Sequence, residues 1–524
     1  MSRTANSIKT FITSAFGDIL LYVLRFVTRT IFINTLGVEY LGIEGLFSNI
    51  LTLLSFTDLG FGVAITFRLY KPIAEHDTKR IQVLMKLYKY VYRGIGIIII
   101  ILGLCCIPLL PLIISDYDNL VVLGISAPLI FMLYVLQTAS TYLFFAYKNA
   151  ITRAHQKTYK LTVASYPISL ASSITQILVL IFLQDFVIYV ACVILFNVLK
   201  NFIFAVISER LYPEELKNTE ESVSKQEILE MVKDCGALLL YKTNNVVLKA
   251  TDNIVLSVLL GLASVGIYAN YLMIHNAMQN ILGHLFKAMT ASIGNLHAEH
   301  AGSARELKVF RQLNHMSFFV YGIVDVAVFC ALDSFVTVWV GDEYVLGVSF
   351  AAFFCLENYL KGNMRFIGQF RDGMGLFQQV KIRPIISALV NVVVSVWGVM
   401  QFGVLGVVLG TVAAHLMADF WIDALMVHKY GLAQPLKEYG MYMLKNLYFL
   451  VILLASGAVA YVLCTLVGFD GWIAVFVNGC IGFAVFLLFA CVFTFRMPEF
   501  KDNVAVIVRL FGKLGRKIVK HKRL

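Results

Sequence analysis

Charged side chains inside long apolar segments are the residues of this chain best suited to chemistry. Arg25 and Arg29 lie four positions apart in an apolar stretch, so a helix places both on one face. A charge at the centre of a bilayer costs about 2.5–3.5 kcal/mol on insertion scales, and it therefore needs a cavity or a partner. Guanidinium groups bind phosphate bidentately, which suits an anionic head group. The structural alternative is that Asp18 or Asp58 pairs with the two arginines.

An internal repeat adds a third cation to this set. Three groups of identical residues recur 224 positions apart: 36–37 with 260–261, 42–43 with 266–267, and 74–76 with 298–300. Several matches in one ungapped register indicate a duplication. The register makes Lys249 equivalent to Arg25, with Asp252 one turn away. We therefore expect Arg25, Arg29 and Lys249 to bind substrate from two related halves of the chain.

A second charged group has four-residue spacing on one apolar segment and consists of Glu357, Lys361 and Arg365. One interpretation is a self-paired ion stripe near the cytoplasmic end of a helix. The other is a polar strip that faces a central cleft, where Lys361 and Arg365 bind substrate. The spacing fits both interpretations.

A third group repeats this spacing on a later segment and consists of His415, Asp419 and Asp423. Intramembrane ionisable residues often mark ion pathways, so His415 and Asp419, with Asp252, are candidates for binding a coupling proton or sodium ion. Asp423 is expected to reach the cytoplasmic interface. A purely structural polar face is the alternative.

The sequence carries no motif for catalysis, cofactor binding or metal binding. It lacks a P-loop, a zinc motif and a Gly-x-Ser-x-Gly elbow. Its nine cysteines are scattered through apolar segments, and buried free thiols are the simplest interpretation. We expect no catalytic residue, no metal, no cofactor, and no ATP-driven transport by this chain alone.

The composition indicates a membrane protein. Of the 524 residues, 59% are hydrophobic and 14% are charged, against about 25% charged in soluble domains. Apolar runs of about 20 residues recur, each long enough to cross a bilayer as a helix, and they lack the alternation of barrel strands. The expected spans are 11–34, 42–69, 88–113, 120–147, 158–183, 186–208, 236–260, 264–292, 312–332, 345–369, 377–400, 404–427, 444–467 and 472–495.

The loops between these spans differ sharply in charge. Loops after odd-numbered spans contain no Lys or Arg, whereas loops after even-numbered spans hold the cations. The positive-inside rule then predicts that both termini and every cation-bearing loop are cytoplasmic. The net charge of +11 reflects this topology and attraction to anionic membrane lipid, and nucleic acid is not an expected partner. From Glu499 onward, alternating cations and apolar residues predict an interfacial amphipathic helix.

These patterns predict an all-α polytopic membrane protein with about fourteen transmembrane helices, in two pseudo-symmetric six-helix lobes plus two C-terminal helices. Equivalent spans are six apart, an even number, so the lobes share one orientation and an axis along the membrane normal relates them. A cleft between the lobes would open alternately to either side. The expected parts are an N-terminal lobe (1–208), a cytoplasmic linker (209–234), a C-terminal lobe (235–430), helices thirteen and fourteen (431–497) and a basic cytoplasmic tail (498–524).

One block of the sequence has a family resemblance. Residues 36–70, LGVEYLGIEGLFSNILTLLSFTDLGFGVAITFRLY, closely resemble the N-terminal signature of bacterial polysaccharide flippases of the Wzx type. These proteins belong to the multidrug/oligosaccharidyl-lipid/polysaccharide exporter superfamily. The specific part of the resemblance covers residues 24–76, and helix count, duplication and linker position extend it over the whole chain.

The resemblance implies a flippase of the bacterial inner membrane. Such a protein moves an undecaprenyl-diphosphate-linked oligosaccharide from the cytoplasmic to the outer leaflet, for example for O-antigen or capsule synthesis. Family members carry cations in the first helix and central cavity, which match Arg25, Arg29 and, through the repeat, Lys249. Ion coupling would fall in the second lobe, near Asp252 and the span 404–427.

Two other functions fit parts of the sequence. A cation-coupled multidrug exporter of the same superfamily would favour acidic cavity residues over Arg25 and Arg29. A membrane-embedded polysaccharide polymerase or ligase would need a long outer loop with catalytic Arg or His residues. The expected outer loops are short and contain no Lys, Arg or His, which argues against this enzyme.

Overall fold

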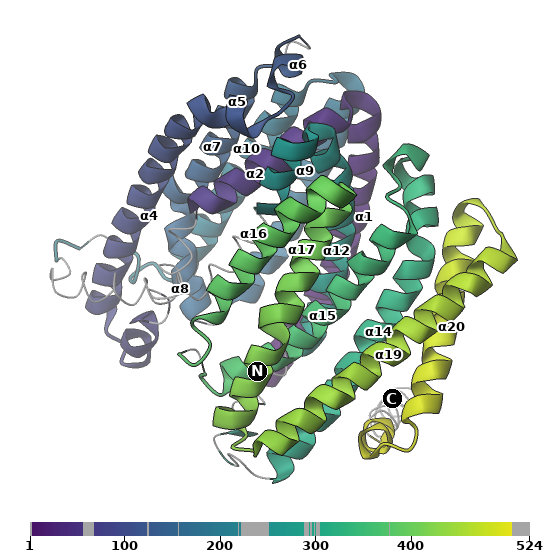
Figure 1. Ribbon diagram of the computed structural model, residues 1–524. Helices are drawn as coiled ribbons and strands as arrows, with labels where there is room; N and C mark the ends of the chain where they lie inside the picture. The colour runs from purple at the N-terminus through teal and green to yellow at the C-terminus, as the bar shows by residue number, and fades with distance from the viewer. Residues whose placement is uncertain are drawn as a thin grey trace, which may run out of the picture. The chain divides into compact units, whose positions relative to one another are not determined.

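The computed structural model is helical along nearly all of the chain that it describes (Figure 1). The described residues are 3–55, 66, 68–122, 125–155, 157–217, 219–221, 251–287, 293, 296–297, 299, 304–376 and 378–505. None of these residues forms a β-strand. Lys249 and Asp58, the linker from residue 222 onward and the tail from residue 506 onward lie outside the described residues.

Ten of the described helical segments are long and apolar enough to cross a membrane. Each of the fourteen expected spans overlaps a described helix, although residues 236–250 of the seventh span lie outside the described residues. The prediction of an all-α, multi-span membrane protein is therefore confirmed. The count of fourteen spans and the cytoplasmic position of the termini stay predictions.

Contacts within the chain divide it into two compact units. Unit 1 comprises Met1–Ile274 and Val399–Val404, and unit 2 comprises His275–Gly398 and Leu405–Leu524. The division falls inside α12 (Leu262–Lys287) and near the end of α16 (Arg383–Phe402). The expected part boundaries at residues 208, 234 and 430 stay a prediction.

In unit 1, long helices pack side by side. Helix α9 packs against α1 and α10, and α7 packs against α2, α4 and α10. Edge-to-face aromatic pairs join them: the ring centroids of Phe47 on α2 and Phe131 on α7 are 5.0 Å apart. The elements are α1 (Arg3–Leu36), α2 (Val38–Leu54), α4 (Thr78–Cys106), η2 (Ile107–Leu109), α5 (Leu110–Ile113), α6 (Tyr117–Val122), α7 (Ala127–Leu143), η3 (Phe145–Lys148), α8 (Asn149–Ala154), α9 (Thr158–Phe182), α10 (Phe186–Leu211) and the helix Thr251–Leu260.

In unit 2, α14 packs against α15, α19 and α20, and α15 packs against α17 and α18. The two C-terminal helices are therefore built onto α14, where the Phe318 ring stacks on Phe449 of α19 at 4.3 Å. The elements are α14 (Ala304–Val340), η4 (Asp342–Tyr344), α15 (Val348–Gly373), α17 (Leu405–Ala414), η5 (His415–Asp419), α18 (Phe420–Met426), η6 (Val427–Gly431), α19 (Leu436–Val467) and α20 (Gly471–Thr494), with most of α16 and the end of α12.

The internal repeat has a structural counterpart within unit 1. Gly37 and Gly261, which are repeat partners, have φ angles of +96° and +86°, a region that favours glycine. The Gly37 N–H donates to Ile33 O at 3.0 Å, and the Gly261 N–H donates to Ser257 O at 3.2 Å. Residues 33 and 257 are also repeat partners, so both copies make the same turn between two helices.

A second pair of repeat glycines lies where α2 meets α12. A Cβ on Gly42 would overlap the carbonyl oxygen of Leu262, and a Cβ on Gly266 would overlap the carbonyl oxygen of Val38. Val38 and Leu262 are themselves repeat partners. The contact is therefore reciprocal, with each copy placing its glycine against the backbone of the other. We call it the glycine crossing.

Candidate functional site

Unit 2 contains a buried network of charged side chains that centres on Glu357 of α15. Glu357 Oε1 lies 3.1 Å from Lys361 Nζ, one turn later on the same helix, and Oε2 lies 3.1 Å from His275 Nδ1 of α12. Lys361 Nζ also lies 3.2 Å from His275 Nε2. Because Glu357 is only 7% exposed, these contacts replace the water that its carboxylate would bind when unfolded.

His415 of η5 continues the network from Glu357 to Asp419. Its Nε2 lies 3.5 Å from Glu357 Oε1, too long for a strong hydrogen bond, and its Nδ1 lies 2.9 Å from Asp419 Oδ2. The Ser387 hydroxyl of α16 donates to the same Asp419 oxygen at 2.9 Å. Arg383 Nε lies 3.5 Å from the other Asp419 oxygen. One imidazole thus stands between two carboxylates.

Asp423 of α18 joins the network to two arginines. Its Oδ2 accepts hydrogen bonds from Arg371 Nη1 at 2.6 Å and from Arg383 Nη1 at 2.7 Å. Its side chain is 1% exposed. Removing one partner of a buried ion pair costs about 3–5 kcal/mol, so this contact fixes α15, α16 and α18 to one another.

The formal charges of this network balance without its histidines. The cations are Lys361, Arg371 and Arg383, of which Lys361 is partly exposed, and the buried carboxylates are Glu357, Asp419 and Asp423. Asp372, which also pairs with Arg371, is partly exposed. The imidazoles of His275 and His415 are then the groups whose protonation changes the net charge near neutral pH.

His415 and Asp419 lie in a π-helical turn, and a second π-helical turn follows at Val427–Gly431. π-Helical turns are rare insertions in α-helices and occur frequently at functional sites. The helix Leu405–Gly431 is also mostly buried inside the protein, so its polar groups depend on protein partners. The sequence predicted the spacing of His415 and Asp419 but not this backbone form.

Lys361 and Arg365, both predicted to bind substrate, differ in their surroundings. Lys361 pairs with Glu357 as the ion-stripe interpretation describes. Arg365 instead donates from Nη1 to the backbone oxygen of Gln279 on α12, at 2.5 Å. Gly283 makes room for this contact, because a Cβ at that position would overlap the guanidinium group. Arg365 thus ties α15 to α12 as well as carrying charge.

A buried chain of amides and a carboxylate lies next to this contact. Gln279 Nε2 donates to Asn358 Oδ1 at 2.6 Å, and Asn358 Nδ2 donates to Asp325 Oδ1 at 2.6 Å. The chain connects α12, α15 and α14. No role was predicted for Asp325 from the sequence, and these contacts show it to be the end of a polar connection between three helices.

The predicted residues of unit 1 have unequal surroundings. Arg25 on α1 is exposed, and its guanidinium lies 5.3 Å from the Tyr22 ring centroid. Arg29 is half-buried near Glu44, whose charge it opposes, and its Nη1 has no hydrogen-bond partner among the described residues. Asp252 is buried on the helix Thr251–Leu260, in unit 1, whereas its two proposed ion-coupling partners belong to unit 2. Lys249 lies outside the described residues.

Lys200 on α10 is a cation that sequence reasoning missed. It lies close enough to Arg25 for the two positive charges to act on each other, and its Nζ donates to Asn197 Oδ1 at 3.2 Å. Within the described residues, neither Lys200 nor Arg25 forms an ion pair with a carboxylate. A single lysine amid the apolar residues 186–206 was the available sequence signal. Two like charges thus lie within electrostatic range of each other on helices expected to span the membrane.

Solved structures with the same fold are flippases and transporters. A structure of the lipid II flippase MurJ, in an inward closed conformation, matches with a TM-score of 0.65 at 16% identity and covers 92% of this chain and 99% of that one. An inward-facing multidrug transporter of the MATE family matches at 0.60 and 15% identity, covering 79% and 98%. A mutant of the Vibrio cholerae MATE transporter VcmN matches at 0.56 and 11% identity, covering 81% and 97%. These likenesses show a shared fold.

Sequence comparison gives the family. No curated protein matches the chain significantly. The family model described as "Polysaccharide biosynthesis protein" matches residues 7–290, more than half of the chain. This chain therefore belongs to the polysaccharide biosynthesis protein family.

Proposed function

We propose that this protein is a flippase of the bacterial plasma membrane that moves an undecaprenyl-diphosphate-linked oligosaccharide from the cytoplasmic to the outer leaflet. The sugar would then enter a cell-surface polysaccharide such as O-antigen or capsule. The protein makes and breaks no covalent bond in this proposal. The family and the fold shared with a lipid II flippase support it.

The observation that carries the proposal is the Arg25–Lys200 cation pair in unit 1. Two like charges on apolar helices raise each other's energy, and burial in a membrane adds to the cost. Such a pair becomes favourable when an anion with several oxygens binds both cations. A diphosphate supplies that anion, and a guanidinium can bind it bidentately.

The proposed mechanism is alternating access. Arg25 and Lys200, with Arg29 and Lys249, bind the diphosphate while the protein is open to the cytoplasm. The sugar enters the polar interior, and the prenyl chain stays in the lipid. The protein then opens to the outside and releases the head group.

We infer that coupling uses a proton and that the network around His415 binds it. Sodium prefers oxygen ligands, whereas here the carboxylates of Glu357 and Asp419 already face Lys361, Arg383 and the imidazoles. A proton needs only an imidazole nitrogen. Its inward movement would supply roughly 2.3 kcal/mol per 100 mV of membrane potential.

The test of this function is lipid extraction from a strain that lacks the protein. We expect an undecaprenyl-diphosphate-linked oligosaccharide to accumulate on the cytoplasmic leaflet, and its sugar composition would identify the substrate. Accumulation should disappear when the wild-type chain is restored. Normal lipid composition together with normal surface polysaccharide would show that the protein does something else.

Replacement of Arg25 tests the cation pair. In the deletion strain, we expect Arg25→Ala to lower polysaccharide export at least tenfold at normal expression, since charge-assisted hydrogen bonds contribute about 1.5–3 kcal/mol each. Lys200→Ala should lower export in the same way. The exposed Arg153→Ala, on α8, is the matched control and should export normally. Export by Arg25→Ala at the control level would refute the role of Arg25.

A cation-coupled multidrug exporter is the second candidate, because the matching solved structures include MATE transporters. A binding site for organic cations is expected to offer carboxylates, and Arg25 with Lys200 offers positive charge instead. Growth in the presence of cationic dyes, with and without the protein, separates the two functions. Protection by the wild-type chain would favour the exporter.

A further inference from the structure

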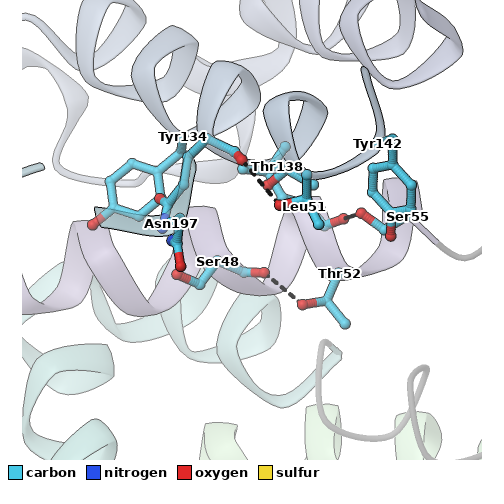
Figure 2. Close-up of a pocket in the computed structure, with 10 residues that line it drawn as sticks. Ser48, Leu51, Thr52, Ser55, Tyr134, Thr138, Tyr142 and Asn197 are labelled. Atoms are coloured by element: carbon cyan, nitrogen blue, oxygen red, sulfur yellow. Dashed lines mark hydrogen bonds between the residues drawn. The ribbon is translucent and has the colours of Figure 1, made fainter. Parts of the chain in front are cut away.

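Unit 1 contains a cavity of about 330 Å³ between α2, α7 and α10. Figure 2 shows Ser48 and Thr52 of α2, Thr138 of α7 and Asn197 of α10 lining this cavity. Nine of its ten lining residues carry a hydroxyl or an amide, none carries a charge, and Leu51 is the apolar exception. Small-molecule sites combine apolar surface with a few polar groups that fix the orientation of the ligand, and here hydroxyl and amide groups supply the polar part.

Several polar groups of the lining have hydrogen-bonding capacity that protein groups do not fill. The hydroxyls of Thr52 and Ser55 each donate to a carbonyl of their own helix at 2.7 Å, which leaves their lone pairs as acceptors. Among the described residues, no protein group forms a hydrogen bond with the side chains of Ser48, Gln137 or Thr138. Polar groups on membrane helices are costly without partners, so water or a polar ligand completes them.

A sugar ring fits this chemistry. Each sugar hydroxyl donates and accepts hydrogen bonds, as do the serine, threonine and amide groups of the lining. Tyr134 and Tyr142 add aromatic surface for the C–H faces of the ring. The volume lies at the lower end of the usual range for ligand sites, about 300–1,000 Å³, and it suits one or two rings better than a long chain.

The cavity lies beside the cation pair of the same unit. Asn197, a lining residue, accepts a hydrogen bond from Lys200 at 3.2 Å, and Lys200 is close to Arg25. Neutral hydroxyl and amide groups thus adjoin Lys200, and Arg25 lies within electrostatic range of Lys200. In a lipid-linked oligosaccharide, the first sugar is bonded directly to the diphosphate, so a site for that sugar is expected next to the cations that bind the diphosphate.

We propose that this cavity binds the first sugar residues of the lipid-linked oligosaccharide while Arg25 and Lys200 bind its diphosphate. The inference rests on the proposed flippase function and adds the residues that recognise the sugar. Ser48, Gln137 and Thr138 are the recognition residues, because their polar groups lack protein partners among the described residues.

The experiment compares the binding of two probes to the purified full chain. One probe is the lipid-linked oligosaccharide extracted from the deletion strain, and the other is undecaprenyl diphosphate without sugar. The test variant combines Ser48→Ala with Thr138→Val, which removes two hydroxyls with little change in volume. Gln137→Leu is tested separately, and Thr175→Val on α9, whose hydroxyl lies outside the lining, is the control.

We expect the double variant to bind the glycosylated probe about tenfold more weakly, since a net hydrogen bond contributes about 0.5–1.5 kcal/mol and tenfold is about 1.4 kcal/mol. Its affinity for undecaprenyl diphosphate should equal that of the wild type and of Thr175→Val. Arg25→Ala should weaken binding of both probes. The proposed sugar site thus predicts that the double variant loses affinity only for the probe that carries the sugar.

The outcomes separate this inference from the function on which it rests. If the wild type binds the glycosylated probe and the cavity variants bind it equally well, the sugar site is wrong and the flippase function stands. Equal losses for both probes would also overturn the sugar site, because they would indicate damage to the fold or to the phosphate site. If the wild type binds neither probe, the flippase function fails and the inference fails with it.

Discussion

His415 stands between Glu357 and Asp419, and a neutral imidazole carries only one N–H for these two acceptors. A protonated ring carries one N–H toward each of them. The surrounding cations already balance the carboxylates, so protonation adds one net charge inside the membrane helices. The added charge acts on the contact between Glu357 of α15 and His415 of the helix Leu405–Gly431.

Replacement of His415 therefore tests the coupling proposal. We expect His415→Gln in proteoliposomes to lose proton movement upon addition of the lipid-linked substrate, because glutamine cannot take up a proton. Substrate binding should remain within a few-fold of the wild type, since the residues proposed to bind the diphosphate lie in unit 1. A pH-sensitive dye trapped inside the vesicles reports the proton movement.

His428 offers a matched control on the same helix. Its Nδ1 hydrogen-bonds the backbone oxygen of Ala424 at 2.8 Å, and its ring packs against Phe310. It does not contact the carboxylates of the network among the described residues. His428→Gln should keep proton movement at equal protein yield. Equal loss in both variants would mean that any damage to this helix stops transport.

The four-residue spacing along one helix predicted which residues of the network lie together on that helix. It did not predict their partners on other helices. Lys361 and Glu357, or His415 and Asp419, are four apart and so share a face. His275 and Arg383 come from other helices, and tertiary packing alone brings them to Glu357 and Asp419. Lys200 was missed for the same reason, because a lone lysine has no periodic partner.

At the scale of elements, the glycine crossing sets how closely α2 and α12 approach. The space that a Cβ would occupy is filled by backbone carbonyl oxygens, and backbone cannot turn aside as a flexible side chain can. Small residues at such crossings let helices approach closely in membranes, where water does not drive them together. The crossing should therefore be sensitive to a single methyl group.

Alanine substitution measures this sensitivity. We expect Gly42→Ala to lower the free energy of unfolding by about 1–3 kcal/mol, the usual cost of overpacking, and Gly266→Ala to act similarly. Thermal unfolding in detergent micelles reports the change. Gly94→Ala on α4 is the control, because among the described residues no atom beyond the adjacent backbone of its own helix lies within 4 Å of its added Cβ.

Alanine at position 94 should be neutral or stabilising, since it removes only the flexibility of a glycine inside a helix. If Gly42→Ala and Gly94→Ala unfolded at the same temperature, the glycine crossing would tolerate a methyl group. The prediction that a Cβ at Gly42 overpacks this contact would then be wrong.

Some local features of these elements could be predicted from the sequence, and others could not. The repeat identified Gly37 and Gly261 as equivalent, and glycine is the residue type that adopts their positive φ angles without strain. The π-helical turns at His415–Asp419 and Val427–Gly431 were not predictable, because an apolar helix gives no signal that separates π from α periodicity.

At the scale of the whole molecule, hydropathy and charge carry most of the information. Backbone groups must be satisfied inside lipid, so long apolar runs become helices whatever their exact residues. This is why the all-α class follows from sequence and is confirmed. Contacts between distant helices depend on side-chain shapes, so the division of the chain inside α12 at Ile274 did not follow from composition.

The charge asymmetry of the loops gives a prediction about orientation. We expect Glu343→Cys, in an exposed cation-free loop, to react with a membrane-impermeant maleimide in intact cells. Lys79→Cys, in an exposed cationic segment, should react only after the membrane is opened. Both changes belong in a background in which serine replaces the nine native cysteines, of which Cys105 and Cys480 are exposed. Labelling of both positions in intact cells, or the reverse pattern, would overturn the expected topology.

The reciprocal contact of Gly42 and Gly266 also bears on the origin of the chain. A self-complementary patch can join two separate copies of a half-length ancestor before any gene fusion, because each copy already carries both sides of the joint. Later fusion of the two genes would then link two copies that already associated through this contact. In such a dimer, any substitution of the ancestral glycine would have altered the interface at two symmetric places, one in each copy.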